Sequence, residues 1–91
     1  MDRIEQFCET LDRAYAQGEP ETVEKFLRQV NDDARVRKDR WLMLTVQNEL
    51  GSFCRGAGRY AESLEAFTIA AEAAKELCGP DSEEYANVLN N

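Results

Sequence analysis

Apolar residues recur every three or four positions along most of this chain, and this spacing constrains its fold more than any other feature. In the first segment the spacing is followed by Ile4, Phe7, Cys8, Leu11, Ala14 and Tyr15. Such spacing places apolar side chains in a stripe along one side of an α-helix. No segment alternates apolar and polar residues as a half-buried strand does. The sequence therefore predicts an all-α fold in which each helix buries one side.

Glycine and proline mark three of the turns between these helices. Glycine readily takes the left-handed conformation that ends a helix, and proline is tolerated in a first helical turn but not in a helix interior. The predicted turns are residues 18–20, 56–58 and 79–80, and a polar turn precedes residue 39. We therefore expect about five helices, which span residues 2–17, 20–36, 39–57, 60–78 and 82–90. Connections this short make neighbouring helices antiparallel.

Two of the helix starts carry capping signals. Asp39 is the predicted N-cap of the third helix, because a short acidic side chain accepts hydrogen bonds from N–H groups of the first turn. Asp81 and Glu84 have the spacing of the N-cap and N3 residues of a capping box. This spacing predicts Asp81 as the N-cap of the fifth helix.

The third and fourth helices carry the widest apolar surfaces. Trp41 and Leu44 add a second apolar side to the third helix, whose main stripe is Leu42, Val46, Leu50, Phe53, Cys54 and Ala57. A helix that is apolar on more than one side is predicted to lie between neighbours. The fourth helix is expected to bury Leu64, Phe67, Ala70, Ala71, Ala74, Leu77 and Cys78.

Charge and hydropathy exclude several classes of protein. The net charge is -7, and the bases gather between residues 35 and 60. Because the acidic flanks would repel phosphate, we predict no nucleic-acid binding, and the basic stretch is a solvated surface or a contact for an acidic peptide. The longest apolar run, residues 41–44, is too short to cross a membrane, and the acidic N-terminus does not resemble a signal peptide. We therefore expect a soluble, cytoplasmic protein without a membrane partner.

The three cysteines are predicted to be reduced and structural. Cys8, Cys54 and Cys78 lack Cys-x-x-Cys spacing, and the chain has no histidine, so no metal site is expected. Cys8 and Cys54 are expected on apolar helix faces, where free cysteine behaves as a small apolar residue. Cys78 is expected to be more exposed, because it lies near a helix end.

An internal repeat joins residues 47–50 to residues 89–91 at a spacing of 42. Between them, Gly51 is expected to let a neighbouring helix approach closely, and Tyr60 to pack across the start of the fourth helix. The seam between the third and fourth helices is expected to consist of Ser63, Phe67 and Ala70.

These residues resemble the tetratricopeptide repeat, in the longer form of about 42 residues found in kinesin light chains. The motifs are Gly-Arg-Tyr-x-Glu-Ser at 58–63, Leu-Cys-Gly-Pro-Asp at 77–81 and Leu-Asn-Asn at 89–91. Cys54 and Ser63 replace the usual aromatic residue and alanine. The resemblance implies antiparallel helix pairs stacked as a short right-handed α-solenoid. It comprises a degenerate pair (1–38), a well-formed repeat (39–80) and the first helix of a further repeat (81–91). The chain also resembles the start of longer bacterial proteins of this family, so we expect a fragment.

The resemblance further implies a binding module, in which the first helix of each pair lines a concave groove that holds a peptide or a partner protein. The candidates on the expected inward side are Glu9, Asp12, Tyr15, Thr45, Asn48, Glu49, Ser52, Arg55 and Asn90, with Glu5 extending the surface. Asn48 and Asn90 are 42 residues apart, and their amides can bond a peptide backbone, whereas Arg55 can bond a carboxylate. A solvated helix face without a ligand is the alternative for each residue.

No enzyme and no cofactor are expected, because the chain lacks a phosphate-binding loop, a nucleophile elbow and any Cys/His pair. Two other roles stay open. Tyr85, Val88 and Leu89 are expected to be uncovered on the last helix, which would favour a homodimer or a structural oligomerisation unit. The chain could also be the sensing segment of a peptide-responsive regulator.

Overall fold

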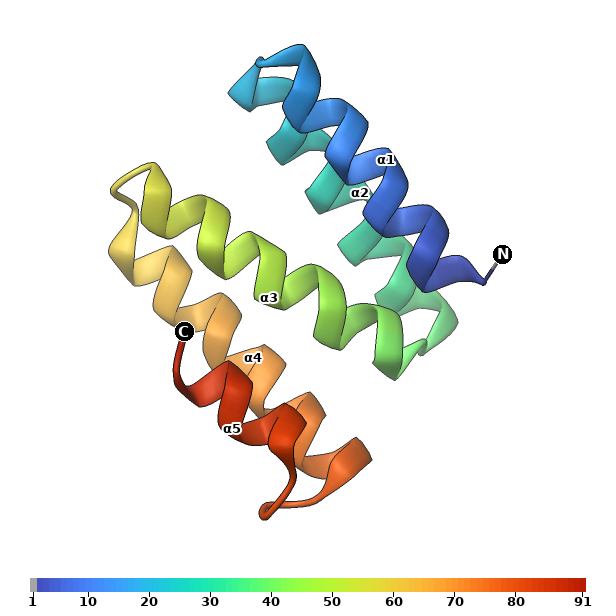
Figure 1. Ribbon diagram of the computed structural model, residues 1–91, viewed down its shortest axis with the longest axis vertical. Helices are drawn as coiled ribbons and strands as arrows, with labels where there is room; N and C mark the ends of the chain where they lie inside the picture. Colours follow the sequence, from blue (N-terminus) through green and yellow to red (C-terminus); the bar gives the residue numbers. More distant parts are fainter. Residues whose placement is uncertain (1) are drawn as a thin grey trace.

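The computed structural model describes residues 2–91, which form five α-helices joined by short turns (Figure 1). The helices are α1 (Arg3–Gln17), α2 (Pro20–Arg37), α3 (Arg40–Gly56), α4 (Tyr60–Cys78) and α5 (Glu83–Leu89). The predicted all-α class is confirmed, and each predicted helix end lies within one residue of the observed one.

The helix ends follow the capping chemistry of the sequence, with one exception. Gly18 ends α1 in the left-handed conformation, with φ 81°, and the Asp39 carboxylate accepts a hydrogen bond of 3.2 Å from the Leu42 N–H, as predicted. The prediction of Asp81 as N-cap of α5 is wrong. Ser82 takes this place because its hydroxyl accepts from the Tyr85 N–H at 3.1 Å and donates to the Gly79 carbonyl at 2.7 Å, which closes the turn.

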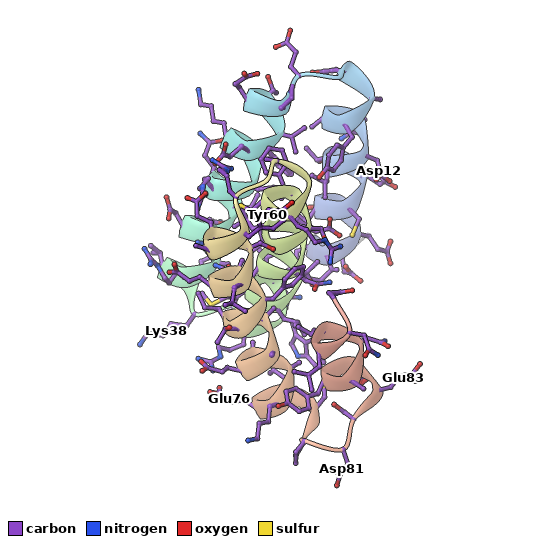
Figure 2. All side chains as sticks on the ribbon, turned by 90° about the vertical axis from the view of Figure 1, so that its left-hand side faces the viewer. Asp12, Lys38, Tyr60, Glu76, Asp81 and Glu83 are labelled. Carbon is purple, nitrogen blue, oxygen red and sulfur yellow. The ribbon has the colours of Figure 1, made fainter. Side chains whose placement is uncertain are left out.

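The helices pack as sequential antiparallel pairs in two layers. Viewed from the side, α1 and α5 lie on one side of the molecule and α2 and α4 on the other (Figure 2). Helix α3 packs most extensively on α4 and next on α2. The central position of α3 agrees with its two apolar sides.

Helix α3 contributes to both clusters of the hydrophobic core. Leu42, Val46 and Leu50 join the first cluster, with buried residues of α1 and α2 and with Ala66 of α4. Leu44 joins the second cluster, which contains Ala70, Ala73, Ala74 and Val88. The prediction that α3 lies between neighbours is confirmed.

The seam between α3 and α4 depends on Gly51. A Cβ atom at this position would lie 2.6 Å from the Phe67 ring, so only glycine lets the ring approach α3 this closely. The buried Ser63 hydroxyl donates a hydrogen bond of 2.7 Å to the Gly51 carbonyl and so satisfies its own polar group. The predicted roles of Gly51, Ser63, Phe67 and Ala70 are confirmed.

The first helix pair buries the same positions as the second at a spacing of 40 residues. Along α1 and α3 the equivalent buried pairs are Phe7 and Gln47, Leu11 and Gly51, and Ala14 and Cys54. Along α2 and α4 they include Val23 and Ser63, and Ala34 and Ala74. The two pairs therefore share one packing pattern although few of their residues are identical.

Four predictions of burial are wrong. Cys8 is exposed because α1 packs only through the narrow stripe of Phe7, Leu11 and Ala14. Tyr60 and Leu64 are exposed because they lie on the side of α4 away from its buried alanines. Val88, expected to be uncovered, is buried against Leu44 and the α4 alanines.

No helix among residues 2–91 combines the length and the apolar character that a membrane-spanning helix needs.

Candidate functional site

The predicted binding residues of α1 and α3 gather around two hollows. The α3/α5 cleft, of about 210 Å³, is lined by Thr45, Asn48 and Glu49 of α3 and by residues of α5, including Glu84 and Asn87. The Tyr15 pocket, of about 340 Å³, lies where α1 ends, α2 begins and α3 ends, and is lined by Tyr15, Pro20, Ser52, Phe53, Gly56 and Ala57. The structure thus distributes five of the predicted residues between two hollows on one face.

Asp12, Tyr15 and Glu49 form an acidic bridge between these hollows. Burial, followed by the nearby Asp12 carboxylate, raises the pKa of Glu49. Burial raises the pKa of Tyr15 too, and the charge of Glu49 adds to the effect. None of the ion pairs found in residues 2–91 involves Asp12 or Glu49. Glu49 therefore holds a partly buried negative charge at the expense of its own solvation.

Asn48 and Arg55 are engaged with the C-terminal residue. The Asn91 side-chain amide donates a hydrogen bond of 2.8 Å to Asn48 Oδ1, and Arg55 Nη1 donates one of 3.0 Å to the Asn91 carbonyl. The Arg55 guanidinium also lies 5.5 Å from the centre of the Phe67 ring. Both side chains therefore hold the end of α5 against α3.

The other two candidates lie outside the hollows. Glu9 is exposed on α1, and Asn90 is the exposed C-cap of α5. The residue that contacts Asn48 is Asn91, one position beyond the 42-residue counterpart Asn90.

Comparison with known families gives one match. A family model described as tetratricopeptide repeat matches residues 42–91, which is just over half of the chain and includes nearly all of α3 and all of α4 and α5. The chain belongs to the tetratricopeptide-repeat family. Comparisons with curated proteins and with solved structures gave no significant match. The tetratricopeptide repeat is a non-catalytic module that mediates contacts between proteins, so protein interaction is the general function of this chain.

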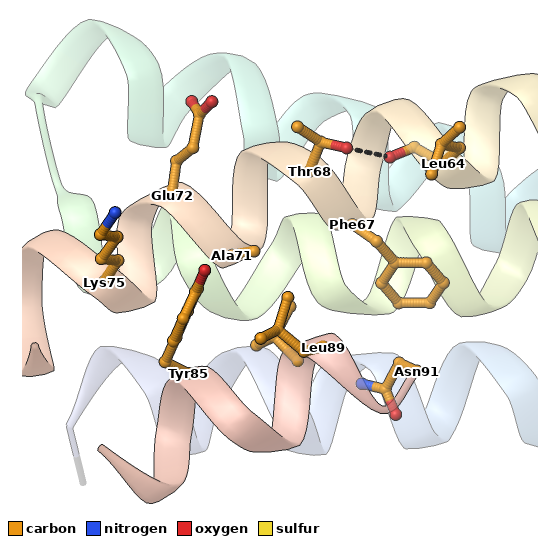
Figure 3. Close-up of a pocket in the computed structure, with 10 residues that line it drawn as sticks. Leu64, Phe67, Thr68, Ala71, Glu72, Lys75, Tyr85, Leu89 and Asn91 are labelled. Carbon is orange, nitrogen blue, oxygen red and sulfur yellow. Dashed lines mark hydrogen bonds between the residues drawn. The ribbon is translucent and has the colours of Figure 1, made fainter. Parts of the chain in front are cut away.

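Two features of this tetratricopeptide-repeat chain were missed by sequence reasoning. Gln47 is buried, and its amide donates a hydrogen bond of 2.7 Å to Asn31 Oδ1, which joins α3 to α2. The second feature is the α4/α5 groove, whose apolar lining is Leu64, Phe67, Ala71, Tyr85, Val88 and Leu89 (Figure 3). The 40-residue spacing is the signal for both, because it aligns Gln47 with the buried Phe7 and α4 with α2.

The described residues of the repeat offer no metal site. Across residues 2–91, no three His, Cys, Asp or Glu side chains come close enough together to hold an ion. The polar groups of the site can therefore act on a ligand through hydrogen bonds and charge.

Proposed function

We propose that this chain is a non-catalytic interaction module that binds an extended segment of a partner protein along the face formed by α1, α3 and α5. The observation that carries the proposal is the half-buried Glu49 carboxylate beside Asp12, with a hollow on each side. A cationic side chain placed between these two carboxylates would replace their lost solvation and remove their mutual repulsion.

The charge of this face favours a basic partner segment. Arg55, the basic candidate on α3, donates to the Asn91 carbonyl, whereas Asp12 and Glu49 lack a cationic partner among residues 2–91. An apolar side chain next to the basic residue would fill the Tyr15 pocket against Phe53. The proposed ligand is therefore an extended segment that carries Lys or Arg beside an apolar residue.

Selection from a random library of unstructured peptides tests this function. We expect the selected peptides to be rich in Lys and Arg beside an apolar residue, and to shift the backbone NMR signals of Tyr15, Glu49 and Ser52. The double change Asp12→Asn with Glu49→Gln should weaken the best peptide at least about tenfold, because two charge-assisted contacts are lost.

Glu65→Gln is the matched control, because it removes a carboxylate on α4, beside the cleft between α2 and α4. It should leave the affinity unchanged. Affinity should also fall when the pH is lowered through the raised pKa of Glu49, since protonation removes the charge. Acidic selected peptides, or an affinity that ignores the double change, would refute the proposal.

We also propose that the repeat is of the longer form of about 42 residues. Val46 of α3 and Val88 of α5 are 42 residues apart, and both are buried. A longer form is supported because these equivalent residues pack in the two core clusters that meet at α3.

A further inference from the structure

The α4/α5 groove is an apolar surface distinct from the proposed peptide-binding face. It has a volume of about 420 Å³ and lies on the side of α5 opposite the α3/α5 cleft. Leu64 on α4 is 69% exposed and Leu89 on α5 is 60% exposed, so both walls present large apolar side chains to solvent. Figure 3 shows Phe67, Ala71 and Tyr85 between them.

The 40-residue spacing identifies what shape this groove fits. The α2 residues that line the cleft beside α4 are Arg28, Asn31, Asp32 and Arg35. Forty residues later stand Thr68, Ala71, Glu72 and Lys75, which line the α4/α5 groove. Helix α4 occupies the position alongside the first set. The second set is therefore the equivalent surface, and its shape is suited to another α-helix.

The chemistry of the two surfaces differs at one end. Helix α4 is tied to α2 by the ion pairs Arg59 with Glu24, at 2.7 Å, and Arg28 with Glu62, at 3.7 Å. At the positions equivalent to Glu24 and Arg28, α4 carries Leu64 and Thr68. A helix in the α4/α5 groove therefore meets an apolar wall where α4 meets charges.

We propose that the α4/α5 groove binds an amphipathic α-helix supplied by a partner protein. By analogy with α4, its inner side carries small residues, as Ala70 and Ala74 do, and both of these are fully buried in their own interface. In place of Arg59 it carries an apolar residue, which contacts Leu64. Glu72 and Lys75 on the rim offer one charge of each sign to polar flanks of the helix.

A second copy of this chain fits the groove less well than a foreign helix. Each helix of residues 2–91 already buries side chains within its own chain. A groove placed against a second groove also leaves the hollow between the two walls unfilled.

A synthetic peptide based on α4 tests the proposal. The probe has the sequence of residues 59–77 with Arg59→Leu, and its binding to the whole chain is measured by fluorescence anisotropy. We expect it to bind several-fold more tightly than the peptide that retains Arg59. We expect no binding of a peptide that also carries Ala70→Glu and Ala74→Glu, because these charges would be buried.

Substitutions in the protein locate the binding site. Leu64→Glu should weaken the Arg59→Leu peptide at least about tenfold, and Leu89→Glu should do the same from the other wall. Val36→Glu is the matched control, because Val36 is 82% exposed on α2, outside the groove. Because all three side chains are exposed, each variant should keep the unfolding midpoint of the parent chain.

Three results would overturn the proposal: no binding of the probe, binding that ignores both groove variants, or a dimer without peptide that Leu64→Glu dissociates. The last result, measured by light scattering, would assign the groove to a second copy. None of these results bears on Asp12 and Glu49, so the proposed peptide-binding function is tested separately.

Discussion

At position 51 the absence of a side chain determines how closely α4 lies against α3. The equivalent position in the first helix pair is Leu11, and the position equivalent to Phe67 is Leu27. Leu11 and Leu27 belong to one core cluster, whereas the Phe67 ring occupies the place where a Gly51 side chain would be. The two pairs thus fill similar space with a medium pair of residues in one case and a small and a large residue in the other.

This exchange of volume predicts a compensated double variant. Gly51→Ala should destabilise the chain by about 1–3 kcal/mol, because the new methyl group displaces the Phe67 ring. Adding Phe67→Leu should restore part of the loss. Urea denaturation measures both, and Gly56→Ala is the control, because a Cβ there meets no atom within 4 Å. Equal losses at positions 51 and 56 would contradict the packing argument.

Backbone conformation at the turns gives a second prediction at this scale. Lys38 ends α2 with φ 57°, a left-handed conformation that glycine adopts at lower cost. Lys38→Gly should therefore raise the free energy of unfolding by about 0.5–1 kcal/mol, part of the gain being offset by a more flexible unfolded chain. Gly18→Ala, at φ 81°, should lower it by about 1 kcal/mol. Thermal unfolding checks whether the two changes have opposite signs.

At the scale of the helix, side chains from other elements decide how the ends are held. Asp39 caps α3 and also pairs with Arg3 of α1, so one carboxylate joins the start of the third helix to the start of the first. Arg40 pairs with Glu76 and joins the same end of α3 to the end of α4. Helix α3 is therefore fixed at its N-terminus by two neighbours and by its cap.

The Asp39 contacts predict a pH-dependent contribution to stability. The hydrogen bond from Arg3, and next that from the Leu42 N–H, lower the pKa of Asp39. Because the folded pKa lies below the unfolded value of about 3.9, the stabilisation is present above that value and is lost as the pH falls through the folded pKa. Asp39→Ala should cost about 1 kcal/mol near neutral pH and progressively less in acid.

Asp39→Asn separates the cap from the charge, because asparagine caps helices about as well as aspartate. It should keep most of the stability and lose the pH dependence. If Asp39→Ala remained equally destabilising at low pH, the carboxylate charge would have no part in the contribution. Denaturant midpoints across the acid range provide the measurement.

Across the whole molecule, α5 depends on few contacts. It has one buried residue, Val88, and its end is held by the bonds of Asn48 and Arg55 to Asn91. The first core cluster contains no residue of α5. The structure therefore predicts that α5 opens separately from the rest of the chain.

Hydrogen exchange tests this separation. Val88→Ala should destabilise α5 by about 1–3 kcal/mol and speed exchange of its amides, while the amides of α1 and α2 keep their rates. Val23→Ala, which changes the same residue type in the first cluster, should instead speed exchange across the first three helices. Equal effects of the two variants would show that the chain opens as a single unit.

Local chemistry made much of this fold predictable. Helix positions follow from apolar spacing and from turn residues such as Gly18 and Gly58, because these act within a few residues of the chain. The error at Asp81 has the same scale: two adjacent residues could both cap, and the bonds of Ser82 to Gly79 and Tyr85 favoured the second. Membership of the family was also recognisable, because its motifs are contiguous in the sequence.

The candidate site was predictable only in part. The sequence placed Asp12, Tyr15 and Glu49 on inward helix faces, but their mutual contact depends on how α1 lies against α3. Likewise, Asn48 and Arg55 were expected to meet a ligand, and the structure occupies both with Asn91. A helix stripe gives the direction of a side chain but not the neighbour that it meets.

By itself, the sequence determined that this chain forms five helices in antiparallel pairs, because periodicity and short turns act locally. The tertiary structure alone decided which apolar residues remain exposed. Val88 is buried and Leu64 is not, although both lie on apolar stripes, because α3 and α4 cover Val88 whereas Leu64 borders an open groove. Burial is a property of what lies opposite a residue, and distant segments of the chain supply it.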